Sequence, residues 1–215
     1  MNIDKRVYDY RDLVIEKNKV MNLTNITDIS EFNKRHIEDS LSIINKIELS
    51  GRVLDIGTGA GFPGIPLALY YKNLNFTLLD SQRKKLDFIK DSCRKLDIKN
   101  VTTIHSRAED LARDKLHREL YDFVVTRAVA SLSVLIELSI PFLKIGGKLV
   151  AYKGKSVFDE IKSSSNAFDK LNCMIENIIE YKINNIRYYI VIVKKESKTD
   201  IKYPRKAGTI KKSIL

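Results

Sequence analysis

Residues 53–66 read Val-Leu-Asp-Ile-Gly-Thr-Gly-Ala-Gly-Phe-Pro-Gly-Ile-Pro, and this stretch decides the fold. The apolar run at 52–56 predicts a strand. Helix-forming residues from Ile65 onward predict a helix with prolines at its entrance, where a missing N–H is tolerated. The glycines between them let the main chain turn sharply and approach a ligand closely. Because a helix N-terminus also offers unpaired N–H groups and partial positive charge, the stretch predicts a backbone cradle for the polar end of a small molecule.

Two ligands compete for this cradle. The spacing of Gly59, Gly61 and Gly64 satisfies the dinucleotide fingerprint, although that pattern alone is a weak signal. Asp80 ends the apolar run 75–79 and supplies the carboxylate that a ribose diol requires, which both ligands carry. Asp55 stands two residues before the first glycine, where it would repel a phosphate and attract an ammonium group. We therefore expect S-adenosylmethionine (AdoMet), with a dinucleotide and a purely structural turn as the alternatives.

Composition narrows the class of protein. The 215 residues, 44% of them hydrophobic, suffice for one good core. No apolar run approaches the length of a membrane span, and the first residues lack the apolar core of a signal peptide. Cys93 and Cys173 form no metal-ligand motif and the three histidines are scattered, so we expect no metal. Few cysteines and no export signal predict a cytoplasmic protein.

The charge points to a partner. The formal net charge is +11, and residues 194–215 hold eight basic against two acidic residues. Such a surplus favours a polyanion, because binding releases counterions. The alternative is a lysine-rich composition that serves solubility.

The chain divides into three segments of one domain. Residues 1–50 predict a helical extension, with Val7, Tyr10 and Val14 at helical spacing, residues 51–195 an AdoMet-binding core, and residues 196–215 a basic tail. The tail's composition is compatible with mobility in the absence of a partner. Strands alternate with amphipathic helices in the core, which predicts a parallel sheet with helices on both faces. The expected strands lie at 52–56, 75–80, 101–105, 121–126 and 147–152.

The end of the core has a different pattern. Runs at 174–183 and 187–193 are separated by three residues, too few for a parallel crossover, so they predict an antiparallel hairpin. A helix over 132–143 is expected to stop at Gly146-Gly147. The fold class is therefore α/β: a mostly parallel seven-stranded sheet with an antiparallel last strand, typical of the Rossmann-like AdoMet-dependent methyltransferases.

Ligands of open α/β sheets lie outside the carboxyl ends of the strands. Read in order, these ends give Asp55 and Gly57 for the methionine end of the cofactor, Asp80 for the ribose, and residues 106–109 for the adenine. The next two ends carry Arg127 and Lys153, cations that do not serve readily as bases.

These two cations constrain the reaction. No strand end carries the Asp/Asn-Pro-Pro-aromatic motif that would position an exocyclic amine, and neither cysteine is placed for covalent attack on a pyrimidine. A ring nitrogen with its own lone pair needs placement and no base. Guanine N7 fits this requirement, and its neighbour O6 offers an arginine a second acceptor. Either cation could instead hold a phosphate or pair with a core carboxylate.

His36, within 34–40, lies in a predicted helix ahead of the cradle. A helix cap or a core histidine is its ordinary interpretation, and a contact with the substrate is the alternative.

Several motifs together resemble a known family. They are Asn22-Leu23-Thr24, Arg35-His36-Ile37-x-Asp39-Ser40-Leu41, the run 55–66, Arg127-Ala128-Val129-Ala130, Ala151-Tyr152-Lys153-Gly154 and Tyr203-Pro204-Arg205-Lys206-Ala207-Gly208. Their order over nearly the whole chain resembles the bacterial small-subunit ribosomal RNA guanine-N7 methyltransferases, also called glucose-inhibited division protein B.

The resemblance implies methylation of one guanine at N7 in the 530 loop of 16S ribosomal RNA. We expect 16S ribosomal RNA or the small ribosomal subunit as the partner, and a monomeric enzyme. It implies AdoMet contacts from Gly57, Phe62, Ala108, Glu109 and Arg127, to which the cradle adds Asp55, Gly59 and Asp80. For RNA contacts, the motifs and the basic tail give Arg35, His36, Lys153, Arg205 and Lys206. Arg127 and Lys153 are the candidate catalytic residues, and a methyltransferase acting on another RNA or on a small molecule is the alternative.

Overall fold

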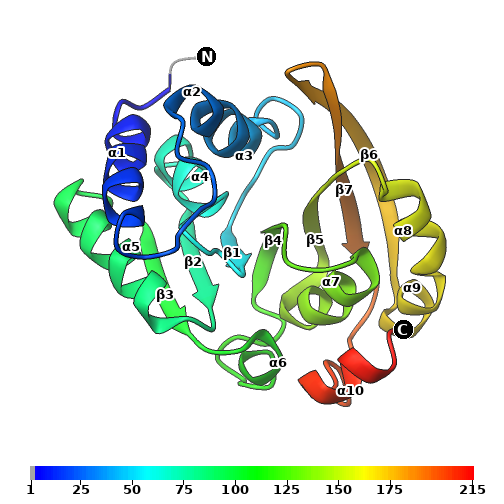
Figure 1. Cartoon of the computed structure of the whole chain (residues 1–215). Helices are drawn as coiled ribbons and strands as arrows, with labels where there is room; N and C mark the ends of the chain where they lie inside the picture. Colours follow the sequence, from blue (N-terminus) through cyan, green and yellow to red (C-terminus); the bar gives the residue numbers. More distant parts are fainter. Residues whose placement is uncertain (1–2) are drawn as a thin grey trace.

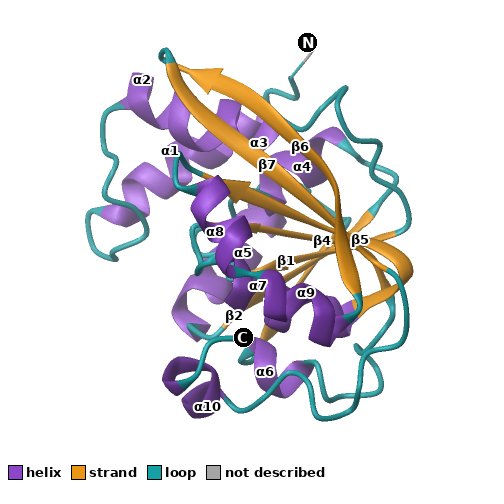
Figure 2. Cartoon of the chain, turned by 90° about the vertical axis from the view of Figure 1, so that its right-hand side faces the viewer, coloured by secondary structure: helices purple, strands orange, loops and turns teal. Residues whose placement is uncertain are grey.

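The computed structural model describes residues 3–215, which form a seven-stranded sheet flanked by helices (Figures 1 and 2). The strand order is β3-β2-β1-β4-β5-β7-β6. The first five strands pair in parallel, β7 lies antiparallel to β5, and β6 lies antiparallel to β7. This confirms the expected fold class. The strands are β1 (Arg52–Ile56), β2 (Asn75–Asp80), β3 (Val101–His105), β4 (Tyr121–Arg127), β5 (Leu143–Lys153), β6 (Cys173–Ile183) and β7 (Ile186–Lys195).

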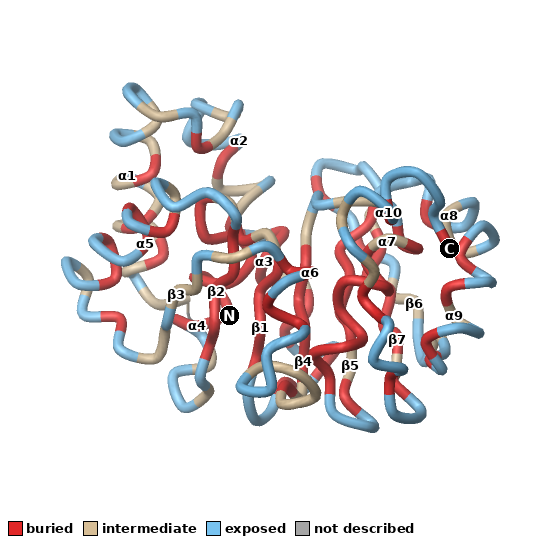
Figure 3. The backbone as a smooth tube through the Cα atoms, turned by 90° about the horizontal axis from the view of Figure 1, so that it is seen from below, coloured by how far each residue is buried: buried red, intermediate tan, exposed pale blue. Residues whose placement is uncertain are grey.

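The helices cover both faces of the sheet, and two separate apolar cores lie beneath them. Neighbouring strand residues supply opposite cores: Val53 and Val150 belong to one, Leu54 and Leu149 to the other. Strands buried on both faces are expected of a mostly parallel sheet, and the central strands are the most buried part of the chain (Figure 3).

One core is covered by α1 (Arg6–Asn18), α2 (Ile29–Phe32), the π-helix η1 (Asn33–Glu38), α3 (Asp39–Leu41), α4 (Gly64–Tyr70) and α5 (Arg83–Lys95). The other is covered by α6 (Ala108–Leu111), α7 (Leu132–Ser139), the 3-10 turn η2 (Ile140–Phe142), α8 (Val157–Ser163), α9 (Ser165–Leu171) and α10 (Ala207–Lys212).

The prediction for residues 132–147 was wrong at its end. Helix α7 stops at Ser139, and β5 already begins at Leu143. Pro141 lacks the N–H that would continue the α-helix. Gly146, at φ +82°, and Gly147 lie within β5, where the register against β4 shifts. A Cβ on Gly147 would lie 3.0 Å from the Asp122 carbonyl oxygen, so these glycines form an irregularity in a strand and do not cap a helix.

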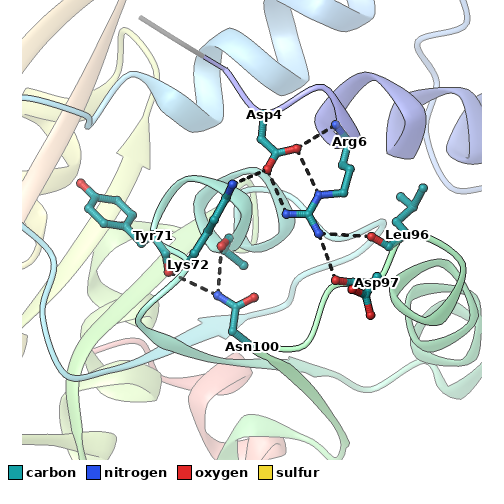
Figure 4. Close-up of polar contacts among 8 residues, drawn as sticks. Asp4, Arg6, Tyr71, Lys72, Leu96, Asp97 and Asn100 are labelled. Atoms are coloured by element: carbon teal, nitrogen blue, oxygen red, sulfur yellow. Dashed lines mark hydrogen bonds and ion pairs between the residues drawn. The ribbon is translucent and has the colours of Figure 1, made fainter.

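The N-terminal extension is fixed to the core by apolar and ionic contacts. Val7, Tyr10 and Val14 of α1 are buried, as their spacing predicts. Before the helix, Asp4 accepts hydrogen bonds from Arg6 and pairs with Lys72 at 2.9 Å (Figure 4). Arg6 also donates to the carbonyls of Leu96 and Asp97, which joins the extension to the loop after α5.

The tail also packs on the core. Tyr203, Ile210 and Leu215 are buried in the second core. The Arg118 guanidinium donates to the carbonyls of Thr199, Asp200 and Tyr203, so residues 199–203 lie against the loop after α6. Among residues 3–215, no helix is both long and apolar enough to cross a membrane.

Candidate functional site

A cavity of about 430 Å³ opens at the carboxyl ends of β1 to β4. Its volume falls within the usual range of small-ligand pockets. Seven of the eight predicted cofactor residues line it, and so does one predicted RNA contact, His36. The seven are Gly57, Gly59, Phe62, Asp80, Ala108, Glu109 and Arg127, the last of which is also a predicted catalytic residue.

The glycine loop forms one side of this cavity through its backbone. Gly57 and Gly59 both adopt positive φ, +69° and +58°, which favours glycine. The N–H of Gly57 donates to the Leu79 carbonyl at 2.8 Å, which ties the loop to β2. A Cβ on Gly57 would lie 2.7 Å from Val129, whereas a Cβ on Gly59 would meet no atom closer than 3.9 Å. Gly57 is therefore required by packing, and Gly59 leaves open space beside the loop.

Asp80 links the loop to the second strand. Its Oδ2 accepts a hydrogen bond from the Gly59 N–H at 2.9 Å, and its Oδ1 accepts one from the Gln82 N–H at 2.8 Å. Each carboxylate oxygen has capacity for a further donor. Asp80 is therefore positioned and still able to bind the two hydroxyls of a ribose.

Asp55 lies beneath the loop and outside the cavity wall. It is fully buried, and its Oδ2 accepts hydrogen bonds from Thr58 Oγ1 at 2.6 Å and from the Gly64 N–H at 3.0 Å. Burial raises its pKa to about 7, against the lowering effect of these two hydrogen bonds. Its Oδ1 is buried without a partner in the part of the chain that the structure describes. Asp55 thus shapes the cradle from below, and the structure does not bring it to the position expected for a ligand contact.

The opposite wall is built around Arg127 at the end of β4. Its Nη1 donates to the Arg35 carbonyl and to Asp39 Oδ2, both at 2.9 Å, and its Nη2 donates to His36 Nδ1 at 2.8 Å. All three acceptors come from η1 and the residue that follows it. A π-helix leaves carbonyls free of the regular ladder and often occurs at functional sites. The widened turn of the N-terminal extension therefore surrounds the guanidinium.

His36 is a neutral member of this wall. Because its Nδ1 accepts from Arg127, its proton is assigned to Nε2, which donates to Thr24 Oγ1 at 2.8 Å. Its ring stacks on Phe62 with centroids 4.9 Å apart. Burial and the charges of Arg127 and Arg35 lower its pKa to about 3. His36 thus contributes a flat, uncharged surface to the cavity.

Asp39 connects this wall to the end of the sheet. Its Oδ1 accepts a hydrogen bond from the Tyr181 hydroxyl of β6, and Tyr152 of β5 donates to the adjacent Ser40 carbonyl. Burial and the nearby charge of Asp39 raise the pKa of Tyr181, so it remains a proton donor. Asp39 therefore balances the charge of Arg127 and links it to β6.

Besides Asp55, four predicted residues do not line the cavity, and three of them form ion pairs elsewhere. The Lys153 ammonium is 2.5 Å from Glu160 Oε2, and the side chain is almost wholly buried. Arg205 makes a two-point ion pair with Glu137, at 2.8 and 2.7 Å, which joins the tail to α7. Arg35 points outward toward Glu31 and offers only its carbonyl to the site.

Lys206 is exposed at the start of α10. Among residues 3–215, no cluster of His, Cys, Asp and Glu could hold a metal ion.

Sequence reasoning missed several residues of the site. Thr24 and Asp39 stood in quoted motifs, but nothing in their spacing indicated that they hold His36 and Arg127. Val129 and Leu23 line the cavity, and Glu160 neutralises Lys153. Their roles come from contacts between distant segments, which local patterns do not reveal.

Comparison with known proteins gives a consistent result. A family model described as rRNA small subunit methyltransferase G matches residues 3–188. Proteins named ribosomal RNA small subunit methyltransferase G from Alkaliphilus metalliredigens and Clostridium beijerinckii are 41% and 42% identical, and each alignment covers 98% of this chain and 90% of the relative.

Solved structures support the fold at low sequence identity. TYW2 from M. jannaschii in complex with AdoMet superimposes with a TM-score of 0.58 at 18% identity, covering 74% of each chain. A SAM-dependent methyltransferase from Aquifex aeolicus gives a TM-score of 0.57 at 16% identity, covering 77% of this chain and 93% of the other. At these identities the similarities show the fold alone.

Proposed function

Because this chain belongs to the rRNA small subunit methyltransferase G family, we propose that it transfers a methyl group from AdoMet to N7 of a guanine in the 530 loop of 16S ribosomal RNA. The observation that carries the proposal is the cavity at the carboxyl edge, with a glycine loop and Asp80 on one side and Arg127 on the other. AdoMet, when bound, supplies an electrophilic methyl carbon on a positively charged sulfur.

The glycine loop and Asp80, which together form the first wall of the cavity, suit that cofactor. The open side of Gly59 admits a ligand close to the backbone, and the Asp80 carboxylate has acceptor capacity for the ribose diol. Ala108 and Glu109, at the start of α6, line the part of the cavity assigned to the adenine. Asp55 acts through Thr58 and Gly64, whose positions it sets.

The second wall, built around Arg127 and His36, suits a nucleobase whose ring nitrogen already holds a lone pair. His36 already accepts a hydrogen bond at Nδ1 and carries its proton on Nε2, and the Arg127 guanidinium only donates, so neither offers a lone pair to a proton of the acceptor. Guanine N7 attacks with its own lone pair, and the protein must only align it with the methyl carbon.

The Arg127 guanidinium has donors left for a ligand. A guanidinium carries five N–H donors, of which three serve Arg35, Asp39 and His36 within residues 3–215. The remaining two are available to an oxygen acceptor in the cavity, either guanine O6 or the cofactor's carboxylate.

The basic surface suits the RNA. Arg35 and Lys206 are exposed, and the net charge of +11 favours a polyanion. Arg205 would have to share its guanidinium between Glu137 and a phosphate. We place the enzyme in the cytoplasm and propose that it acts as a monomer on the small ribosomal subunit.

The test is transfer from labelled AdoMet to small subunits isolated from cells that lack the enzyme, followed by mapping of the modified nucleotide. Naked 16S RNA and free small-molecule acceptors serve as parallel substrates. Label at N7 of one guanine in the 530 loop is the expected result. Label on another RNA position, or only on a small molecule, would overturn the proposal.

A further inference from the structure

The short loop between β4 and α7 is held in an unfavourable conformation beside the cavity. Ala128 has φ +56°, in the left-handed region that residues with a Cβ adopt rarely. Ala128 and Val129 both line the cavity, directly after Arg127. A loop with this backbone conformation needs surrounding contacts that are strong enough to hold it there.

Two charged side chains from β5 and α8 supply such contacts. Lys153 Nζ donates to the Ala130 carbonyl at 2.9 Å, and Glu160 Oε2 accepts from the Leu132 N–H at 2.8 Å. The ammonium and carboxylate also pair with each other. The pair thus binds the backbone on both sides of Ser131, where the loop ends and α7 begins.

The pair is itself well fixed. Ser156 Oγ donates to Glu160 Oε1 at 3.0 Å. Although burial alone would raise the pKa of Glu160, the hydrogen bond and the charge of Lys153 lower it, so the carboxylate stays ionised. Helix α8 packs beside α7, which brings Glu160 to the first turn of that helix (Figure 1).

We propose that Lys153 and Glu160 form a positioning pair, which holds the loop 128–131 so that Arg127, Ala128 and Val129 keep their places on the acceptor side of the cavity. The identity of the acceptor in this inference rests on the proposed function. Lys153 then touches neither the guanine nor the RNA, and its charge is used inside the protein. The pair makes no hydrogen bond or ion pair with the first wall, so its loss should affect AdoMet binding less than turnover.

The test compares two single variants, the double variant that combines them and a matched control, on small subunits that lack the modification. Lys153→Met removes the ammonium with little change in volume, and Glu160→Gln removes only the charge of its partner. Lys148→Met is the matched control, because Lys148 lies on the same strand and pairs with Glu176 at 2.7 Å, away from the cavity.

A misplaced acceptor wall should lower kcat about 10- to 100-fold in Lys153→Met and less in Glu160→Gln. The Kd for AdoMet and the KM for the subunit should each change less than about threefold. The double variant should lose little more than Lys153→Met, since both residues act through one loop. Lys148→Met should match the unaltered enzyme.

Three results would overturn the proposal. A kcat within about twofold of the unaltered enzyme in both variants would show that the loop does not need the pair. A higher KM with a salt dependence reduced by about one counterion would make Lys153 a direct phosphate contact. A loss of AdoMet affinity equal to the loss of kcat would indicate a general structural defect.

Hydrogen exchange separates this inference from the proposed function. Amides of residues 128–134 should exchange faster in Lys153→Met than in the unaltered protein, with the glycine loop unchanged. That measurement needs no substrate. If the unaltered enzyme modified no subunit, the proposed function would fall, while unchanged exchange in this segment would overturn the positioning role.

Discussion

The two walls of the cavity are built by different means. The first uses the backbone of residues 57–61 and Asp80, which lie close to each other in the sequence or on paired strands. The second centres on Arg127, whose partners in the N-terminal extension stand 88 to 92 positions away. A local motif therefore prepares the donor side, whereas the acceptor side exists only when the extension is docked.

The largest effect should come from the second wall. Arg127→Ala leaves the buried Asp39 carboxylate without its charged partner and removes a guanidinium from the cavity wall. We expect kcat to fall at least about 100-fold and stability to fall by about 3 kcal/mol, as when a buried pair loses one member. Subunit methylation and urea unfolding would measure the two effects. Near-normal turnover would remove Arg127 from the site.

The second-largest effect should come from a substitution in the first wall. Asp80→Ala removes the acceptor for the N–H groups of Gly59 and Gln82 and for the ribose. AdoMet binding should weaken by about 1–3 kcal/mol, the usual effect of leaving polar groups unpaired. Calorimetric titration measures the change, with Asp110→Ala as an exposed control on α6. An unchanged Kd would assign the ribose to another residue.

Two buried groups, His36 in the second wall and Asp55 beneath the glycine loop, should change stability with pH in opposite directions. His36 has its pKa lowered to about 3, so the unfolded chain binds the proton more readily and stability falls as the pH drops below about 6.5. Asp55 has its pKa raised to about 7, so the folded chain binds the proton more readily and stability rises as the pH drops from about 7 toward 4.

Between pH 7 and pH 5 each group contributes about 2 kcal/mol, with opposite sign, and the two nearly cancel. Asp55→Asn should therefore expose a loss of stability on acidification, and His36→Gln should expose a gain. Urea unfolding at several pH values measures both. Parallel pH curves for the two variants would contradict the assigned burial.

The smallest effect concerns the loop after β4. Ala128→Gly should relieve the left-handed backbone and raise stability by up to about 1 kcal/mol. The greater freedom of glycine should at the same time lower kcat a few-fold, because Val129 and Arg127 lose a fixed neighbour. Thermal unfolding and turnover, measured on the same sample, would show the two changes. Unaltered turnover would mean that the strain has no role in the reaction.

The difference between the walls also explains what the sequence could predict. Strands β1, β2 and β3 begin and end where expected, because each is a short run rich in apolar or β-branched residues between turn residues. Asp80, Ala108 and Glu109 reach the cavity because parallel strands place their carboxyl ends along one edge. The start of β5 was missed because Gly146-Gly147 has the composition of a helix end.

Residues whose role depends on distant partners escaped sequence reasoning. Asp55 is in the expected motif but lies beneath the loop, where Thr58 and Gly64 donate hydrogen bonds to its Oδ2. Lys153 and Arg205 have the charge expected of RNA contacts, yet each pairs with a glutamate on a helix. No local pattern predicts the π-helix or its enclosure of Arg127, since both depend on how the extension packs.

The central claim is that the first wall holds the methyl donor and the second wall faces the acceptor. A crystal structure with AdoMet bound tests it most directly. We predict that the ribose hydroxyls lie on the Asp80 carboxylate and that the methyl group points toward Arg127 and Val129. AdoMet bound away from Asp80, or with its methyl group directed toward Ser106, would contradict the account.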